Sequence, residues 1–132
     1  MQVVVRIVAV LAGVSVVGTI GLIALFASRG NVLSLLSAGW LGALTFAGWV
    51  VTLIAGPIAA IQIWRLRESG RLAGLVLFGA GLAYYVVGGF LLRSAEASAV
   101  QIAAAASMYA LPVAVLLSPQ ARALFTRSAS PR

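Results

Sequence analysis

The residues of this 132-residue chain that could do chemistry are hydroxyl-bearing and aromatic side chains inside long apolar stretches. Trp49, Thr52, Tyr85 and Tyr109 fall near the middle of such stretches, and we take them as candidate ligand residues. Neighbours at a similar level are Ser15, Thr19, Tyr84 and Ser107. If the faces that carry them converge, they line a small cavity for a lipid, quinone, pigment or solute. Hydrogen bonds between helices, averaging about 0.6 kcal/mol, explain the same residues as packing contacts and are the simpler interpretation.

Residue types that are missing from the sequence exclude more chemistry than those present suggest. The chain has no Cys, His, Lys or Asp. Thiol redox pairs, ordinary zinc, copper or haem sites and Schiff-base chemistry therefore lose their central groups. The serines have no side chain to activate them, and Glu68 and Glu96 lie beside arginines in short connections. We therefore expect no enzyme activity, no catalytic residue, no metal site and no cofactor.

The composition is typical of a chain embedded in a lipid bilayer. Hydrophobic residues make up 63% of the sequence and charged residues 8%, and apolar runs this long do not fit inside a soluble domain of this size. A hydrocarbon core about 30 Å thick requires roughly 20 apolar residues for each helical crossing. The sequence predicts four such spans, near residues 7–27, 38–63, 72–92 and 97–117.

The connections between these spans are short, which makes consecutive helices antiparallel neighbours. We therefore expect an all-α transmembrane domain over residues 1–117, folded as an up-down-up-down four-helix bundle. Residues 118–132 are expected to be a cytoplasmic amphipathic tail that begins with a short interfacial helix. Ala121, Leu124 and Phe125 share one face of that helix, and Arg122 and Arg127 are available to meet anionic headgroups. The alternative is that the helix docks on a neighbouring subunit.

The nine basic residues are all arginines, and their positions predict the orientation of the chain. If the amino terminus is inside, the cytoplasmic side holds Arg6, Arg65, Arg67, Arg71, Arg122, Arg127 and Arg132. Arg29 and Arg93 are left outside, in agreement with the positive-inside rule. Both termini are therefore expected in the cytoplasm. The net charge of +7 reflects topology, and no nucleic-acid partner is expected.

Small residues recur along the predicted spans in alternating steps of four and three. In the second span the series is Ala38, Gly42, Thr45, Trp49, Thr52, Gly56 and Ala59. In the third span it is Gly74, Phe78, Gly81, Tyr85 and Gly88. Helices in lipid associate through the close backbone approach that small residues allow. These faces are expected either to pack the bundle internally or to bind another integral membrane protein or a second copy of the chain.

Two segments resemble those of known proteins: Ile-Trp-Arg-Leu-Arg-Glu-Ser-Gly-Arg at residues 63–71, and Leu-Ser-Pro-Gln-Ala-Arg-Ala-Leu-Phe at residues 117–125. Both are similar to segments of small uncharacterised bacterial four-helix inner-membrane proteins. The resemblance implies a multi-pass protein of a bacterial inner (plasma) membrane and implies no activity. Small multidrug-resistance transporters need a carboxylate in the first helix, and four-helix fluoride channels need asparagine within helices. The first predicted span has no carboxylate, and the one asparagine, Asn31, lies in a predicted loop.

These observations predict a non-enzymatic accessory or scaffolding subunit that packs against a larger membrane protein complex. Small-residue faces are plentiful, whereas catalytic and ion-coupling groups within the spans are missing. The alternative is a small oligomeric transporter or channel, which would use the mid-depth polar and aromatic site together with the helices that carry Pro57 and Pro112.

Overall fold

The computed structural model describes residues 1–30, 34, 37, 39–91 and 99–128, with the backbone alone at positions 41 and 89–91. Every regular element in these ranges is a helix, so the all-α prediction is confirmed for the described chain. The elements are α1 (Gln2–Ser28), α3 (Trp40–Trp64), α4 (Glu68–Tyr85), the π-helix η1 (Val86–Leu91), α5 (Ala99–Leu117) and α6 (Pro119–Ser128).

Four helices in the described part of the chain are long and apolar enough to cross a membrane, as predicted. They cover Gln2–Ser28, Gly42–Trp64, Glu68–Gly88 and Ala99–Leu117. The first helix begins five residues before the predicted start at residue 7, so that Arg6 lies within it rather than ahead of it. No proline or glycine precedes Arg6 in the chain, and nothing in this segment ends the helix earlier.

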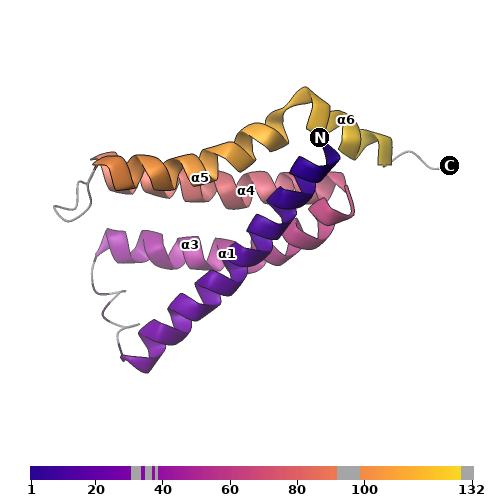
Figure 1. Ribbon diagram of the computed structural model, residues 1–132. Helices are drawn as coiled ribbons and strands as arrows, with labels where there is room; N and C mark the ends of the chain where they lie inside the picture. The colour runs from indigo at the N-terminus through magenta and orange to yellow at the C-terminus, as the bar shows by residue number, and fades with distance from the viewer. Residues whose placement is uncertain (31–33, 35–36, 38, 92–98, 129–132) are drawn as a thin grey trace.

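The helices form a bundle in which α4 is central (Figure 1). It packs against α3 on one side and α5 on the other, while α1 packs mainly against α3. The amino terminus lies beside α6, and from there α1 runs obliquely and diverges from α5 (Figure 1). Helices α1 and α3 approach closely at Gly56, where an added Cβ would collide with the side chain of Val16.

The connection between α3 and α4 is a tight, hydrogen-bonded turn. The N–H of Arg67 donates to the carbonyl of Gln62 and the N–H of Leu66 to that of Ile63, each at 2.9 Å, which is the Schellman pattern of a helix end. Leu66 has φ +54°, a left-handed conformation that costs a non-glycine residue about 1 kcal/mol. Its side chain packs against the core, and its carbonyl accepts a hydrogen bond from the Ser128 hydroxyl of α6.

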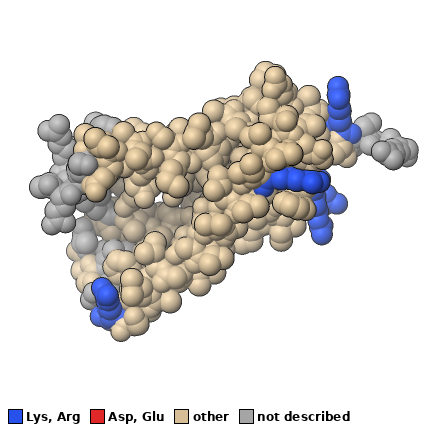
Figure 2. Space-filling view, viewed as in Figure 1, with Lys and Arg blue, Asp and Glu red and all other residues tan. Residues whose placement is uncertain are grey.

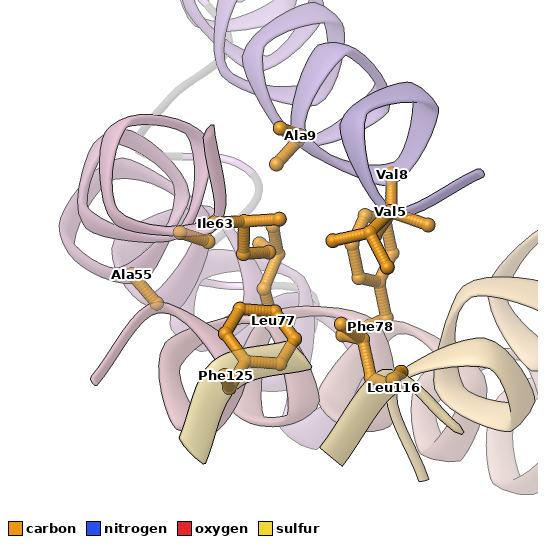
Figure 3. Close-up of a cluster of buried hydrophobic side chains, with 12 residues drawn as sticks. Val5, Val8, Ala9, Ala55, Ile63, Leu77, Phe78, Leu116 and Phe125 are labelled. Carbon is orange, nitrogen blue, oxygen red and sulfur yellow. The ribbon is translucent and has the colours of Figure 1, made fainter. Parts of the chain in front are cut away.

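A core of buried side chains fills the end of the bundle where α1 starts, and we call this the closed end (Figure 3). All five α-helices contribute to it. Its buried members are Val5, Val8, Ala9, Ala12, Ala55, Ala59, Ile63, Leu77, Phe78, Leu116, Ala121 and Phe125. Alanines at the contacts of α1 with α3 let the two backbones approach closely, and larger side chains fill the space between α3, α4, α5 and α6.

The helix predicted at the start of the carboxy-terminal tail is present as α6, but its apolar face is already occupied. Ala121 and Phe125 are fully buried in the core of the same chain, and Leu124 packs against that core. We expected this helix to lie at the membrane interface or to dock on a neighbouring subunit. It docks on its own bundle instead, with Phe125 among the buried side chains of the closed end (Figure 3).

Arg71 ties the start of α4 to the end of α5. Its Nε donates to Glu68 Oε1 at 2.9 Å, and its Nη1 donates to the carbonyl of Leu116 at 3.5 Å. The carbonyls at a helix end lack intrahelical partners and carry partial negative charge, so an arginine stabilises that end. Glu68, expected to be a solvated loop charge, is the first residue of α4 and the partner of this arginine.

Candidate ligand site

A cavity of about 280 Å³ lies in the other half of the bundle, which we call the open end. Three helices provide most of its lining, and Tyr109 alone comes from α5. The described lining residues are Thr19, Leu22, Phe26, Thr45, Gly48, Trp49, Val51, Thr52, Leu77, Ala80, Gly81, Tyr84, Tyr85 and Tyr109. Figure 2 shows the surface hollowed between α1 and α5 on this side of the molecule.

The structure brings the four predicted ligand residues to this one cavity. Trp49 and Thr52 come from α3, Tyr85 from the last position of α4, and Tyr109 from α5. Their convergence is a geometric finding, and ligand binding by them remains a prediction.

The secondary candidates at the same level divide into two groups. Thr19 and Tyr84 line the cavity. Ser15 and Ser107 are not among its described lining residues, and each donates its hydroxyl to a carbonyl of its own helix, Leu11 at 2.9 Å and Ala103 at 2.7 Å.

Aromatic rings form two walls of the cavity. The rings of Tyr85 and Tyr109 have centroids 5.4 Å apart and planes inclined by 31°, which joins α4 to α5. Tyr84 meets Tyr85 edge to face, also at 5.4 Å. Phe26 of α1 and Trp49 of α3 lie 5.6 Å apart across the other side. All these separations are in the range of favourable aromatic pairs, so both walls are held in place without a ligand.

The hydroxyl groups around the cavity differ in whether they are already paired. Thr45 Oγ1 and the Tyr84 hydroxyl lie 3.0 Å apart and join α3 to α4. Thr52 donates to the Gly48 carbonyl of its own helix at 2.8 Å. Tyr85 and Tyr109 have no hydrogen bond from their hydroxyls to any described residue. Two phenol donors therefore stand at the cavity with their hydrogen-bonding capacity unused.

Glycines set the shape of the site in two ways. At Gly81 an added Cβ would collide with the ring of Tyr109, so glycine is required for α5 to bring that ring against α4. At Gly48 an added Cβ would meet no described atom within 4 Å, and the open space beside it belongs to the cavity. Gly74, from the same predicted series as Gly81, is likewise covered by Leu116 and Ile63, whereas nothing described covers Gly88.

The helix geometry changes directly beside the site. At Val86, one residue after Tyr85, α4 continues as the π-helix η1. Wide turns of this kind occur often at functional sites because they rotate the side chains that follow them. The sequence analysis missed this feature, and the only signal for it is the pair Gly88-Gly89, two weak helix formers in succession.

The electrostatic character of the lining limits what the site can do. None of its described residues carries a charge at neutral pH. No group of three or more His, Cys, Asp or Glu side chains gathers anywhere in the described ranges. The arrangement can enclose a neutral molecule and donate hydrogen bonds to it, but the described residues offer no acid–base pair.

Thr45 and Gly48 also line the cavity, but they were not among the predicted ligand residues. Thr45 belongs to the predicted small-residue series and lies one turn before Trp49, so the helical spacing could have placed it on the same face. Nothing in the sequence distinguishes Gly48 from the other glycines.

Comparisons with protein-family models, curated proteins and solved structures gave no match for this chain. The resemblance of residues 63–71 and 117–125 to bacterial inner-membrane proteins therefore stays a prediction. Function is inferred below from the arrangement of the described helices and side chains.

Proposed function

We propose that the chain is a multi-pass protein of a bacterial inner membrane, crossing the bilayer four times in up-down-up-down order with both ends in the cytoplasm. Four long apolar helices support this, as do the many large apolar side chains on their outer faces. Arginines gather at the closed end, with Arg6 on α1, Arg65 and Arg67 in the turn, and Arg122 and Arg127 on α6. Arg29 follows α1 at its other end, and Figure 2 shows basic side chains towards both ends of the molecule.

Cysteine labelling tests this orientation, because the native chain has no cysteine. A membrane-impermeant thiol reagent should label Asn31→Cys and Ser94→Cys in intact cells, although both positions lie outside the described residues. It should spare Ser69→Cys and Ser128→Cys, which sit at the closed end. The opposite labelling pattern would contradict the orientation.

Within that membrane we propose a non-enzymatic accessory role, in which the chain packs against a larger integral membrane protein. The observation that supports it is an uncovered face of α1 opposite the side that packs on α3. The face consists of Val10, Val14, Val17, Gly18, Gly21 and Leu25, all exposed. An added Cβ at either glycine would meet no described atom within 4 Å. Such a face lets a second helix approach closely.

Purification from the native membrane in mild detergent, followed by mass spectrometry, tests the accessory role. A larger polytopic protein should be recovered at fixed stoichiometry. Gly18→Leu and Gly21→Leu should lose that partner without lowering the melting temperature, since both positions are open. Gly79→Leu on α4 is the matched control, because an added Cβ at Gly79 also meets no described atom within 4 Å. Partner recovery unaffected by the α1 variants would remove this face from the proposal.

The second candidate function is a small oligomeric transporter or channel, and the open-end cavity favours it. Solute flux in liposomes containing only this chain, lost in Thr52→Ala or Tyr85→Phe, would replace the accessory role with this one. Both residues line the cavity.

A further inference from the structure

We propose that the open-end cavity binds a neutral, lipid-soluble ring compound bearing carbonyl oxygens, of the quinone class. This inference depends on the proposed membrane location but not on the accessory role. It follows from the size of the cavity, its aromatic walls, its unpaired donors and its lack of charge.

The size of the cavity fits a small ring system. An apolar protein cavity of about 150 Å³ is large enough to take up benzene. The open-end cavity, at about 280 Å³, therefore has room for about two fused rings with a substituent. Its side between α1 and α5 is hollowed at the surface (Figure 2), which gives a tail attached to the ring a way out between these helices.

The walls suit a flat molecule. Tyr85 and Tyr109 lie on the α4–α5 side, and Phe26 and Trp49 lie on the α1–α3 side. Aromatic pairs gain about 0.5–1.5 kcal/mol beyond the burial of their area, so a planar ring between these walls is favoured over a flexible chain of equal volume. The walls are ordered by their own contacts, which reduces the entropy lost when a ligand binds.

The unpaired phenols determine which polar atom the ligand must bring. Tyr85 and Tyr109 donate to no described residue, and the hydrocarbon region of a bilayer supplies no water to satisfy them. Leaving a hydroxyl without a partner in an apolar medium is unfavourable, so an acceptor oxygen in the cavity is stabilised. An acyl chain of a membrane lipid has no acceptor at this depth. A quinone carries two carbonyl acceptors on a flat ring, and it is neutral, as the uncharged lining requires.

Tryptophan fluorescence in detergent tests the proposal, because Trp49 lines the cavity and Trp64 lies at the opposite end of α3. Menadione, a two-ring quinone, should quench a Trp49-only protein (Trp40→Phe with Trp64→Phe) to saturation. A Trp64-only protein (Trp40→Phe with Trp49→Phe) should show weak quenching that rises linearly with concentration. The hydrocarbon 2-methylnaphthalene, which lacks the carbonyls, should compete at least about tenfold less well if each carbonyl hydrogen bond contributes its usual share.

Variants separate this site from a general affinity of the protein for ring compounds. Tyr85→Phe with Tyr109→Phe keeps both rings and should weaken menadione binding about tenfold. Gly48→Leu should abolish saturable binding by filling the cavity, and Gly18→Leu on the outer face of α1 should leave it unchanged.

Linear quenching of Trp49, or an unchanged affinity in the double phenylalanine variant, would overturn the proposal. Equal affinity for menadione and 2-methylnaphthalene would show that the carbonyls contribute nothing to binding and would also overturn the proposal. None of these results depends on whether a partner protein co-purifies.

Discussion

The two ends of the bundle are built from the same kinds of residue but pack to different densities. At the closed end, α1 starts against α3 and α6, and Val5, Ile63 and Phe125 are fully buried. At the open end the same helix diverges from α5 (Figure 1), and Leu22 of α1, which lines the cavity there, is 48% exposed. Overall apolarity therefore does not decide where this chain closes and where it leaves a cavity.

The sizes of the side chains at each level explain the difference. Alanines of α1 and α3 allow close contact at the closed end, and at Gly56 an added Cβ would collide with Val16. Towards the open end, α1 and α3 meet through the large rings of Phe26 and Trp49, whose centroids lie 5.6 Å apart. The described residues around these rings enclose a cavity of about 280 Å³.

The largest effect is expected from breaking the closed end at Phe125. Phe125→Ala removes a fully buried ring and leaves a void among five helices, which costs about 3–5 kcal/mol. The melting temperature in detergent should fall clearly. Phe46→Ala is the matched control, because Phe46 of α3 is 41% exposed and leaves no buried void. Equal losses in the two variants would show that α6 does not stabilise the bundle.

A smaller effect is expected where the two ends meet, at the contact of Gly81 with Tyr109. Gly81→Leu forces the Tyr109 ring away from α4, and overpacking of this kind costs about 1–3 kcal/mol. Gly79 lies on the same helix, and an added Cβ there would meet no described atom within 4 Å. The Gly79→Leu variant should therefore melt at the parent temperature. If Gly81→Leu melts at the parent temperature, the α4 series is not a packing surface.

The smallest effect is expected at the open end, from the hydrogen bond between Thr45 and Tyr84. Thr45→Val removes an interhelical bond, which is worth about 0.6 kcal/mol on average within membranes. Thr52→Val removes only a bond within α3 and should cost less. The free energy of unfolding in a denaturing detergent, measured for both variants, shows which substitution destabilises the protein more. A larger loss for Thr52→Val would mean that Thr52 pairs across the bundle when the protein is in detergent.

Particular residues show how far prediction from this sequence can reach. The apolar stretches placed four helices, because the length and composition of a membrane-crossing segment are local properties. Trp49, Thr52, Tyr85 and Tyr109 were placed at one level by counting along those helices, and all four line the cavity. The burial of Phe125 was not predictable in the same way, because an apolar face on α6 suits lipid, a neighbouring subunit or the chain's own core equally well.

By itself, the sequence determined the helical class, the position of each polar or aromatic side chain along its helix and the helix ends at which the arginines gather. Only the tertiary structure decided which way the side chains face, which separates the covered Gly74 and Gly81 from the uncovered Gly18 and Gly21. The reason is that a helix apolar on every side carries no signal of its rotation about its own axis. That rotation is set by contacts between helices, such as the Tyr109 ring over Gly81, and these contacts exist only once the helices have met.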